Sequence, residues 1–174
     1  MFRCRTVLSH REKRCSSTQP PIQRGEMNAI RPGHSGDYEA IVSLLERDGL
    51  PVADCLPEPP VELRFFVAED PVESRLAGCI GLQHVGEVGL VRSFVVSPDH
   101  RNRGIGAQLL EALHAHARRT GMSQLYLLTT TASAFFARHG YRAIPRETAP
   151  AAIRASTEFS SLCPASAVLM TRSL

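Results

Sequence analysis

Residues 93–106 read SFVVSPDHRNRGIG, and this stretch decides how the rest of the sequence is interpreted. An apolar run ends at a proline, a basic loop with Arg101 and Arg103 follows, and Gly104 and Gly106 stand one residue apart. Glycines between a strand and a helix bring main-chain N–H groups close to a ligand, and the helix N-terminus adds partial positive charge. The arginines add mobile positive charge at the same place. The stretch therefore predicts an anion site, and most often such a site takes phosphate.

Two familiar phosphate-binding motifs do not fit this loop. A P-loop requires GxxxxGK[ST], and no lysine follows Lys13 in this chain. The dinucleotide fingerprint GxGxxG requires a third glycine where GIGAQL has Leu109. The sequence therefore indicates a different pyrophosphate ligand.

Hydrophobic periodicity predicts a mixed α/β sheet flanked by helices, in one domain without internal repeats. The nearly continuous apolar run 87–98 is typical of a central strand, and the apolar stripe of 105–120 predicts a helix that Gly121 closes. Ser35 is expected to cap the helix before the proline-rich stretch 50–60, and Gly49 to end it. The remaining strands are expected at 28–31, 63–70, 73–86 (after a turn near Pro71), 124–130 and 166–172, and the remaining helices at 35–49, 132–140 and within 146–161, with Pro150 in its first turn.

Composition fits a soluble globular protein of 174 residues, 43% of them hydrophobic. The formal net charge is +3, but six basic and two acidic residues fall within residues 1–26, so the remaining chain is close to neutral. We therefore expect that the chain after residue 26 does not bind nucleic acid. No stretch reaches the roughly 18 unbroken apolar residues of a membrane helix, so no membrane partner is expected. The five cysteines form no CxxC pair and read as reduced thiols in a cytoplasmic protein without a metal.

Residues 1–26 lack an apolar segment of signal-peptide length. Their arginines and serines could mimic a transit peptide, although nothing amphipathic repeats there. We favour a disordered extension, or a start codon assigned too early with Met27 as the true start. The folded domain is expected over residues 27–174.

The stretch VVSPDHRNRGIGAQLL resembles the acetyl-CoA loop of the GNAT superfamily of N-acetyltransferases, whose pattern is Arg/Gln-x-x-Gly-x-Gly/Ala after a strand ending in Val-x-Pro. The element order over about 27–172 resembles this family too, which implies a GNAT fold with a mixed, mostly antiparallel sheet. The resemblance implies that loop amides bind the CoA pyrophosphate and that the preceding strand pairs with the pantetheine arm. The cofactor residues that it implies are Phe94, Val95, Val96, Arg101, Asn102, Arg103, Gly104, Ile105, Gly106, Ala107, Thr129 and Phe135.

A second family signature, Asn-x-x-Ala-x-x-Phe-Tyr before Gly-Phe, is only partly present. Thr129 stands where the asparagine usually contacts CoA, and Phe136 stands where many members have the tyrosine that protonates the leaving thiolate. Tyr141 occupies the Gly-Phe position, which usually packs in the core. The departure at Phe136 leaves the general acid open.

Two narrower resemblances concern the acceptor. LYLLTTTASAFFARHGY is similar to the acetyltransferase domain of N-acetylglutamate synthases. Together with AAIRASTEFSSLCPASAVLM, LYLLTTTA is similar to the ArsN-type acetyltransferases that accompany arsenic-resistance genes. The resemblance implies acetyl transfer to the amine of a small amino acid or an amino-acid-like arsenical.

An arginine inside an apolar strand is costly unless it is paired, so Arg92 needs an explanation. It shares a strand face with Leu90, where many relatives carry a glutamate base. Arg92 either binds a substrate carboxylate or other oxyanion through a bidentate fork, or pairs with Glu87, Glu158 or another carboxylate for structure alone. The other acceptor candidates are Thr130, Arg154, Thr157 and Cys163, with an ordinary solvated face as the alternative for Arg154.

The expected chemistry is direct attack of a neutral amine on the thioester, with a carboxylate or histidine removing the proton. Glu87 and Glu158 are the leading candidates for this base, and His84 and His139 are the alternatives. A main-chain N–H at 94–96, where the strand diverges from its neighbour, would meet the oxyanion. His114 and His116 are expected on the surface.

Three further points stay open from the sequence. Cys163 is a structural residue, a substrate contact or, least well supported, a nucleophile. Because Phe136 stands where many family members have a tyrosine, the chain could also be a CoA-binding regulatory module without catalysis. A protein N-terminal acetyltransferase would need an open groove instead of a capped pocket, and a homodimer is possible.

Overall fold

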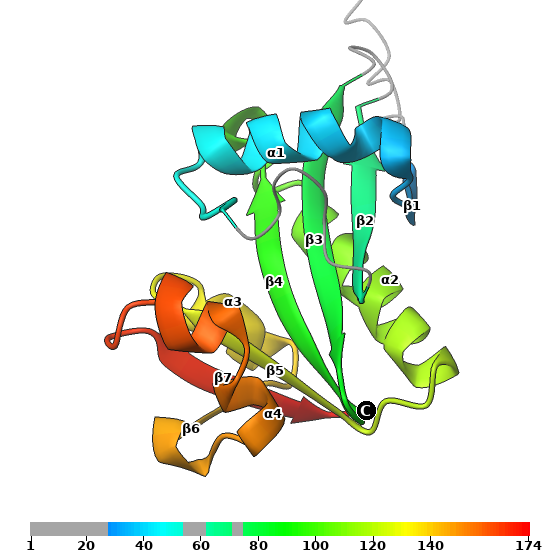
Figure 1. The fold of residues 1–174 in the computed structure, drawn as a ribbon. Helices are drawn as coiled ribbons and strands as arrows, with labels where there is room; N and C mark the ends of the chain where they lie inside the picture. The colour runs from blue at the N-terminus through cyan, green and yellow to red at the C-terminus, as the bar shows by residue number, and fades with distance from the viewer. Residues whose placement is uncertain (1–27, 54–61, 71–74) are drawn as a thin grey trace, which may run out of the picture.

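The computed structural model describes residues 28–53, 62–70 and 75–174 (Figure 1). The predictions for the extension 1–26, for most of the proline-rich stretch 50–60 and for the turn near Pro71 lie outside these residues. Within them, seven strands form one sheet in the order β1-β2-β3-β4-β5-β7-β6. All neighbours are antiparallel except β4 and β5, which confirms the mixed, mostly antiparallel sheet. The strands are β1 (Ile30–Pro32), β2 (Leu63–Glu69), β3 (Leu76–Val85), β4 (Val88–Val96), β5 (Gln124–Thr129), β6 (Arg142–Ile144) and β7 (Val168–Ser173).

Helices cover both faces of this sheet (Figure 1). One apolar cluster joins the α2 face to β2, β3 and β4, and another packs α1 on the opposite face of the same strands. A third cluster lies between α4 and the face of β4, β5 and β7 that carries Leu90. The helices are α1 (Tyr38–Arg47), α2 (Ile105–Arg119), α3 (Ser133–Arg138) and α4 (Ala151–Arg154), with a 3-10 turn η3 (Arg146–Thr148) and a π-turn η4 (Glu158–Leu162).

The central position predicted for the run 87–98 is confirmed, because β4 is the fourth of the seven strands. Its alternation divides the two faces: Val91 packs in the α2 cluster, whereas Leu90 packs in the α4 cluster. Gly89 allows a close approach here, since a Cβ on it would lie 2.6 Å from a Leu125 methyl. The strand is apolar at most positions because both of its faces are covered, and Arg92 is its one charged residue.

Three local predictions need correction. His34, not Ser35, caps the turn that precedes α1, and it does so by accepting a hydrogen bond from the Gly36 N–H. The short strand β6 was not predicted. The single helix expected within 146–161 is divided into α4 and η4, because the Ser156 hydroxyl donates to the Ile153 carbonyl and interrupts the helical pattern.

An ion pair joins β1 to the start of α1. Arg31 donates from Nη1 and Nη2 to the two Asp37 carboxylate oxygens, at 2.6 and 2.7 Å, and only 8% of the Asp37 side chain is exposed. Chiefly through this hydrogen-bonded pairing, Arg31 lowers the pKa of Asp37 below its usual value. A carboxyl whose pKa is lower in the folded chain stabilises the fold above its unfolded pKa and loses that effect as the pH falls.

We predict that Asp37→Asn lowers the free energy of unfolding by about 2 kcal/mol at pH 7, because it removes a charge-assisted bidentate contact. The difference from wild type should shrink as the pH falls below 4. Urea unfolding of both proteins at pH 7, 5 and 3 measures it. A difference that stays constant over this range would show that the charge of Asp37 does not contribute.

Candidate functional site

The loop between β4 and α2 has the backbone that an anion site needs. Gly104 has φ +80 and stands immediately before the first residue of α2, and Asn102 has φ +62. A left-handed backbone at Gly104 turns the chain so that the first amides of α2 face outward. These first-turn N–H groups have no carbonyl partner within the helix. The helix N-terminus therefore presents donors and partial positive charge at the loop.

The two loop arginines differ. Arg101 donates from Nε to the Val96 carbonyl at 2.9 Å and from Nη2 to Asp48 at 2.5 Å. It fixes the loop to the end of β4 and to the residue that follows α1, so the mobile charge expected at Arg101 is in fact anchored. Arg103 is exposed on the loop. Both cations lie beside the start of α2.

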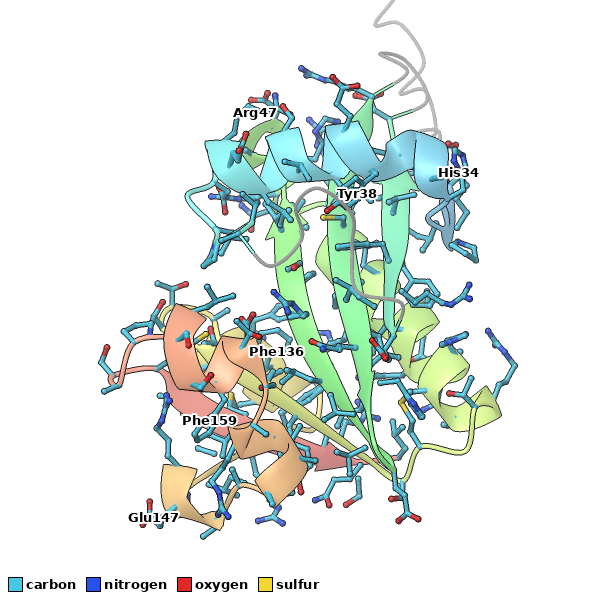
Figure 2. The ribbon with its side chains drawn as sticks, in the orientation of Figure 1. His34, Tyr38, Arg47, Phe136, Glu147 and Phe159 are labelled. Carbon is cyan, nitrogen blue, oxygen red and sulfur yellow. The ribbon has the colours of Figure 1, made fainter. Side chains whose placement is uncertain are left out.

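Aromatic side chains close the space behind this loop. A Cβ on Gly106 would lie 3.1 Å from Phe94 and 3.5 Å from Phe135, so a larger residue at position 106 would press on the Phe94 ring. The Phe94 ring lies 5.4 Å from that of Phe135 and 5.6 Å from that of Phe136. Phe136, labelled in Figure 2, is buried. Ile105 is also buried, and Ala107 is half-buried.

Strands β4 and β5 pair over three residues only, and then they separate. The parallel pairing covers Gly89 to Val91, although β4 continues to Val96 (Figure 1). Ser93 has φ +50, and the register with β3 shifts between Cys79 and Gly81. Such a bulge turns the strand away from its neighbour. The main chain of residues 94–96 therefore borders a gap between strands, as predicted.

A row of polar side chains crosses the sheet beside this gap. We call Gln83, Arg92, Glu158 and Cys163 the Arg92 row. Arg92 is 4% exposed, and its Nη2 lies 2.9 Å from Glu158 Oε2. Its Nη1 donates to Gln83 Oε1 at 3.2 Å, and the Cys163 thiol donates to Glu158 Oε1 at 3.3 Å. The row joins β3, β4 and the segment after α4.

Comparison with known proteins agrees with this geometry. Residues 62–143 match the family model described as "Acetyltransferase (GNAT) domain". Residues 62–143 therefore correspond to a GNAT acetyltransferase domain. The GNAT fold class is confirmed by solved structures that share it.

Three of the similar proteins illustrate the relation. The amino-acid acetyltransferase of Edwardsiella ictaluri is 30% identical over 135 residues, which cover 74% of this chain and 28% of that protein. N-acetylglutamate synthase from Neisseria gonorrhoeae, complexed with coenzyme A and N-acetyl-glutamate, is 26% identical with a TM-score of 0.66 and covers 84% of this chain and 35% of its own. Rv2747 from Mycobacterium tuberculosis, in complex with CoA, is 25% identical with a TM-score of 0.67 and covers 84% and 99%.

The GNAT domain is only a part of most of these relatives. Across eight curated relatives, this chain spans 18% to 54% of the relative's own length. Among residues 28–53, 62–70 and 75–174, no helix is long and apolar enough to cross a membrane. The same residues contain no group of three or more metal-ligating side chains placed to hold an ion.

The two base candidates lie in different parts of the fold, and neither is on β4 itself. Glu158 belongs to the Arg92 row, whereas Glu87 is exposed in the hairpin turn between β3 and β4. His84 also lies away from the row, because it lines a cavity of about 860 Å³ at the start of β2. That cavity is lined by His34, Tyr38, Arg64, His84, His116 and Thr120, among others.

Other predicted residues make local contacts in the GNAT domain. Thr129 Oγ1 accepts from the Ala132 N–H at 3.0 Å, which fixes the start of α3. Arg154 donates to the Ala149 carbonyl at 3.1 Å and is otherwise exposed, as its alternative explanation predicted. Thr130 and Thr157 are exposed. Val95 is buried in the α1 cluster, so only its main chain faces the gap.

Tyr141 lies in the core, and the expectation of a surface position for His114 was wrong. His114 is 1% exposed and its Nε2 lies 3.0 Å from the Tyr141 hydroxyl. Burial, with Arg172 next in importance, lowers the pKa of His114 to about 4. The surface position was expected because the buried face of α2 was assigned from its apolar residues alone. Tyr141 is therefore not placed at the gap as a general acid. The ring centroid of His139 lies 4.4 Å from that of Phe135.

The state of Cys163 follows from its surroundings. Burial, followed by the charge of Glu158 and the hydrogen bond to it, raises the pKa of the thiol to about 12. A nucleophilic cysteine needs a lowered pKa, so this environment opposes that role. The thiol is instead a neutral donor to the carboxylate.

Gln83 and Arg146 were not predicted as site residues, because neither belongs to a motif.

We predict that Cys163 reacts with iodoacetamide at pH 8 at least about tenfold more slowly than a cysteine in a short peptide, because little thiolate is present. Glu158→Gln should accelerate the reaction, since it removes the negative charge that disfavours the thiolate. Mass spectrometry of the Cys163 peptide measures both rates. Equal rates in the two proteins would contradict the proposed coupling between thiol and carboxylate.

Proposed function

We propose that this chain is an acetyl-CoA-dependent N-acetyltransferase that acts on the amine of a small amino acid or an amino-acid-like compound. The observation that carries the proposal is the buried Arg92–Glu158 pair beside the gap between β4 and β5. Amino-acid acetyltransferases among the relatives support the same substrate class. An arsenical acceptor, implied by the resemblance to ArsN-type enzymes, belongs to this class as a candidate.

Acetyl-CoA fits the loop and the gap together. The amides beside Gly104 and Gly106 would take the pyrophosphate, and Arg103 would add charge there. The main chain of Phe94 to Val96 would pair with the pantetheine arm, and Phe135 would border it. Relatives solved in complex with coenzyme A support this assignment. The residues present require no metal for this role.

In the acceptor site, Arg92 would bind the carboxylate of the amino acid and Glu158 would face its amine. Glu158 accepts a proton from the ammonium, and the neutral amine nitrogen then attacks the thioester carbonyl carbon. An N–H of residues 94–96 stabilises the oxyanion. The carbon–sulfur bond breaks and the thiolate leaves with its electron pair, while the second amine proton passes to water as the amide forms.

The leaving thiolate has no tyrosine beside it at position 136. Phe136 is buried among Phe94, Phe135 and Tyr141, so the thiolate would take its proton from water. This substitution is also what favours the second candidate, a CoA-binding module without catalysis. Both the N-acetyltransferase and the non-catalytic module would bind CoA, but only the N-acetyltransferase would transfer acetyl groups.

An acceptor screen with acetyl-CoA decides between these functions. We predict release of free CoA thiol with at least one amino acid or amino-acid arsenical, and stabilisation of the protein by acetyl-CoA in thermal unfolding. The matched control is Gly104→Glu. This substitution puts a residue with a side chain where the backbone has φ +80, and it places a negative charge among the phosphate-binding amides. It should abolish both effects. CoA binding without thiol release from any acceptor would instead support the regulatory module.

We predict that Arg92→Lys raises the acceptor KM by about 30-fold or more, because lysine cannot make the bidentate contact with a carboxylate. The KM for acetyl-CoA should change less than twofold. Steady-state kinetics with each substrate varied separately measures both constants. Parallel increases in the two KM values would assign Arg92 to structure alone.

A further inference from the structure

The segment after α4 contains an unusual turn that places two members of the Arg92 row. In η4, the Cys163 N–H donates to the Glu158 carbonyl at 3.0 Å, a bond between residues five apart. Such π-turns are uncommon and are often found at functional sites. Glu158 is the first residue of η4, and Cys163 immediately follows its last residue. The Cys163 thiol consequently reaches the Glu158 carboxylate at Oε1.

Arg146, from η3, holds this turn at both of its ends. Its Nη2 donates to the carbonyl of Phe159, the residue after Glu158, at 3.2 Å. Its Nη1 donates to the carbonyls of Pro164, the residue after Cys163, and of Ala167, each at 3.2 Å. The guanidinium carbon also lies 4.5 Å from the centre of the Phe159 ring, which is labelled in Figure 2.

We propose that Arg146 is a positioning residue for the acceptor site. Its hydrogen bonds go to main-chain carbonyls and not to the side chains of the Arg92 row, and they fix the main chain next to Glu158 and next to Cys163. Arg146 thereby sets where the Glu158 carboxylate stands relative to Arg92. This inference rests on the proposed function, because it assigns Glu158 to the acceptor amine.

The guanidinium is suited to this task in a way that lysine is not. A planar fork presents donors in fixed directions, so one side chain can bond several carbonyls at once. Its flat face also stacks on the Phe159 ring. A lysine at the same position keeps the charge but has a single ammonium on a flexible stem. The geometry of the fork, not the charge, therefore makes the contacts.

The experiment compares Arg146→Lys and Arg146→Met with the wild-type full-length chain. We expect both variants to raise the acceptor KM by about tenfold or more, since each loses charge-assisted bonds to the turn. The KM for acetyl-CoA should change less than twofold, because the loop at Gly104 is untouched. Arg119→Met, which changes an exposed arginine at the end of α2, is the control and should change neither constant.

Hydrogen exchange supplies a readout that does not depend on activity. In both Arg146 variants, the amides of residues 159–163 should exchange at least about tenfold faster than in wild type, with amides of β4 unchanged. Unchanged exchange at 159–163 would overturn the proposal even if activity falls. Faster exchange with equal rises in both KM values, or with no change in the acceptor KM, would also overturn it and leave Arg146 a structural residue. Absence of acetyl transfer in wild type would reject the proposed function and is thus a separate result.

Discussion

The separation of β4 from β5 is the constraint on which the rest of the site depends. Pairing with β5 ends at Val91, and beyond it the β4 main chain pairs, among the described strands, with β3 alone. Where the strands separate, Ser93 has a left-handed backbone with φ +50, a conformation that costs a non-glycine residue about 1 kcal/mol. The sheet on either side, with apolar clusters on both faces, holds that strained residue in place. Backbone strain of this kind persists where the surrounding structure fixes it.

The opened sheet also explains why a buried cation is tolerated. Arg92 lies on the face of β4 that α1 and α4 cover from opposite ends, so it reaches polar partners between two apolar clusters. Gln83 comes from the neighbouring strand, and Glu158 from a segment 66 residues further along the chain. A buried charge without such partners would cost several kcal/mol. The pair therefore combines a structural requirement with a site that can hold opposite charges of a substrate.

Much of the fold could be predicted from the sequence, because the deciding features are local. The run before Pro98, the glycines at 104 and 106 and the stripe of α2 each follow from neighbouring residues. The failures concern segments with weak local signals. Strand β6 has only three residues, and its pairing with β7 creates it. His114 can be buried because Tyr141, immediately before β6, and Arg172, in β7, supply polar partners.

The sequence by itself determined the resemblance to the GNAT family, most of the order of the elements and the glycine turn before α2, since a left-handed glycine at a helix start is a local requirement. It also identified Arg92 as a residue that needs a partner. Only the tertiary structure decided which carboxylate that partner is. Glu87 and Glu158 are equivalent in a sequence, and the π-turn, Ser156 and Arg146 together bring Glu158 to Arg92. Contacts between residues distant in the chain depend on packing, and packing is not encoded in any single stretch.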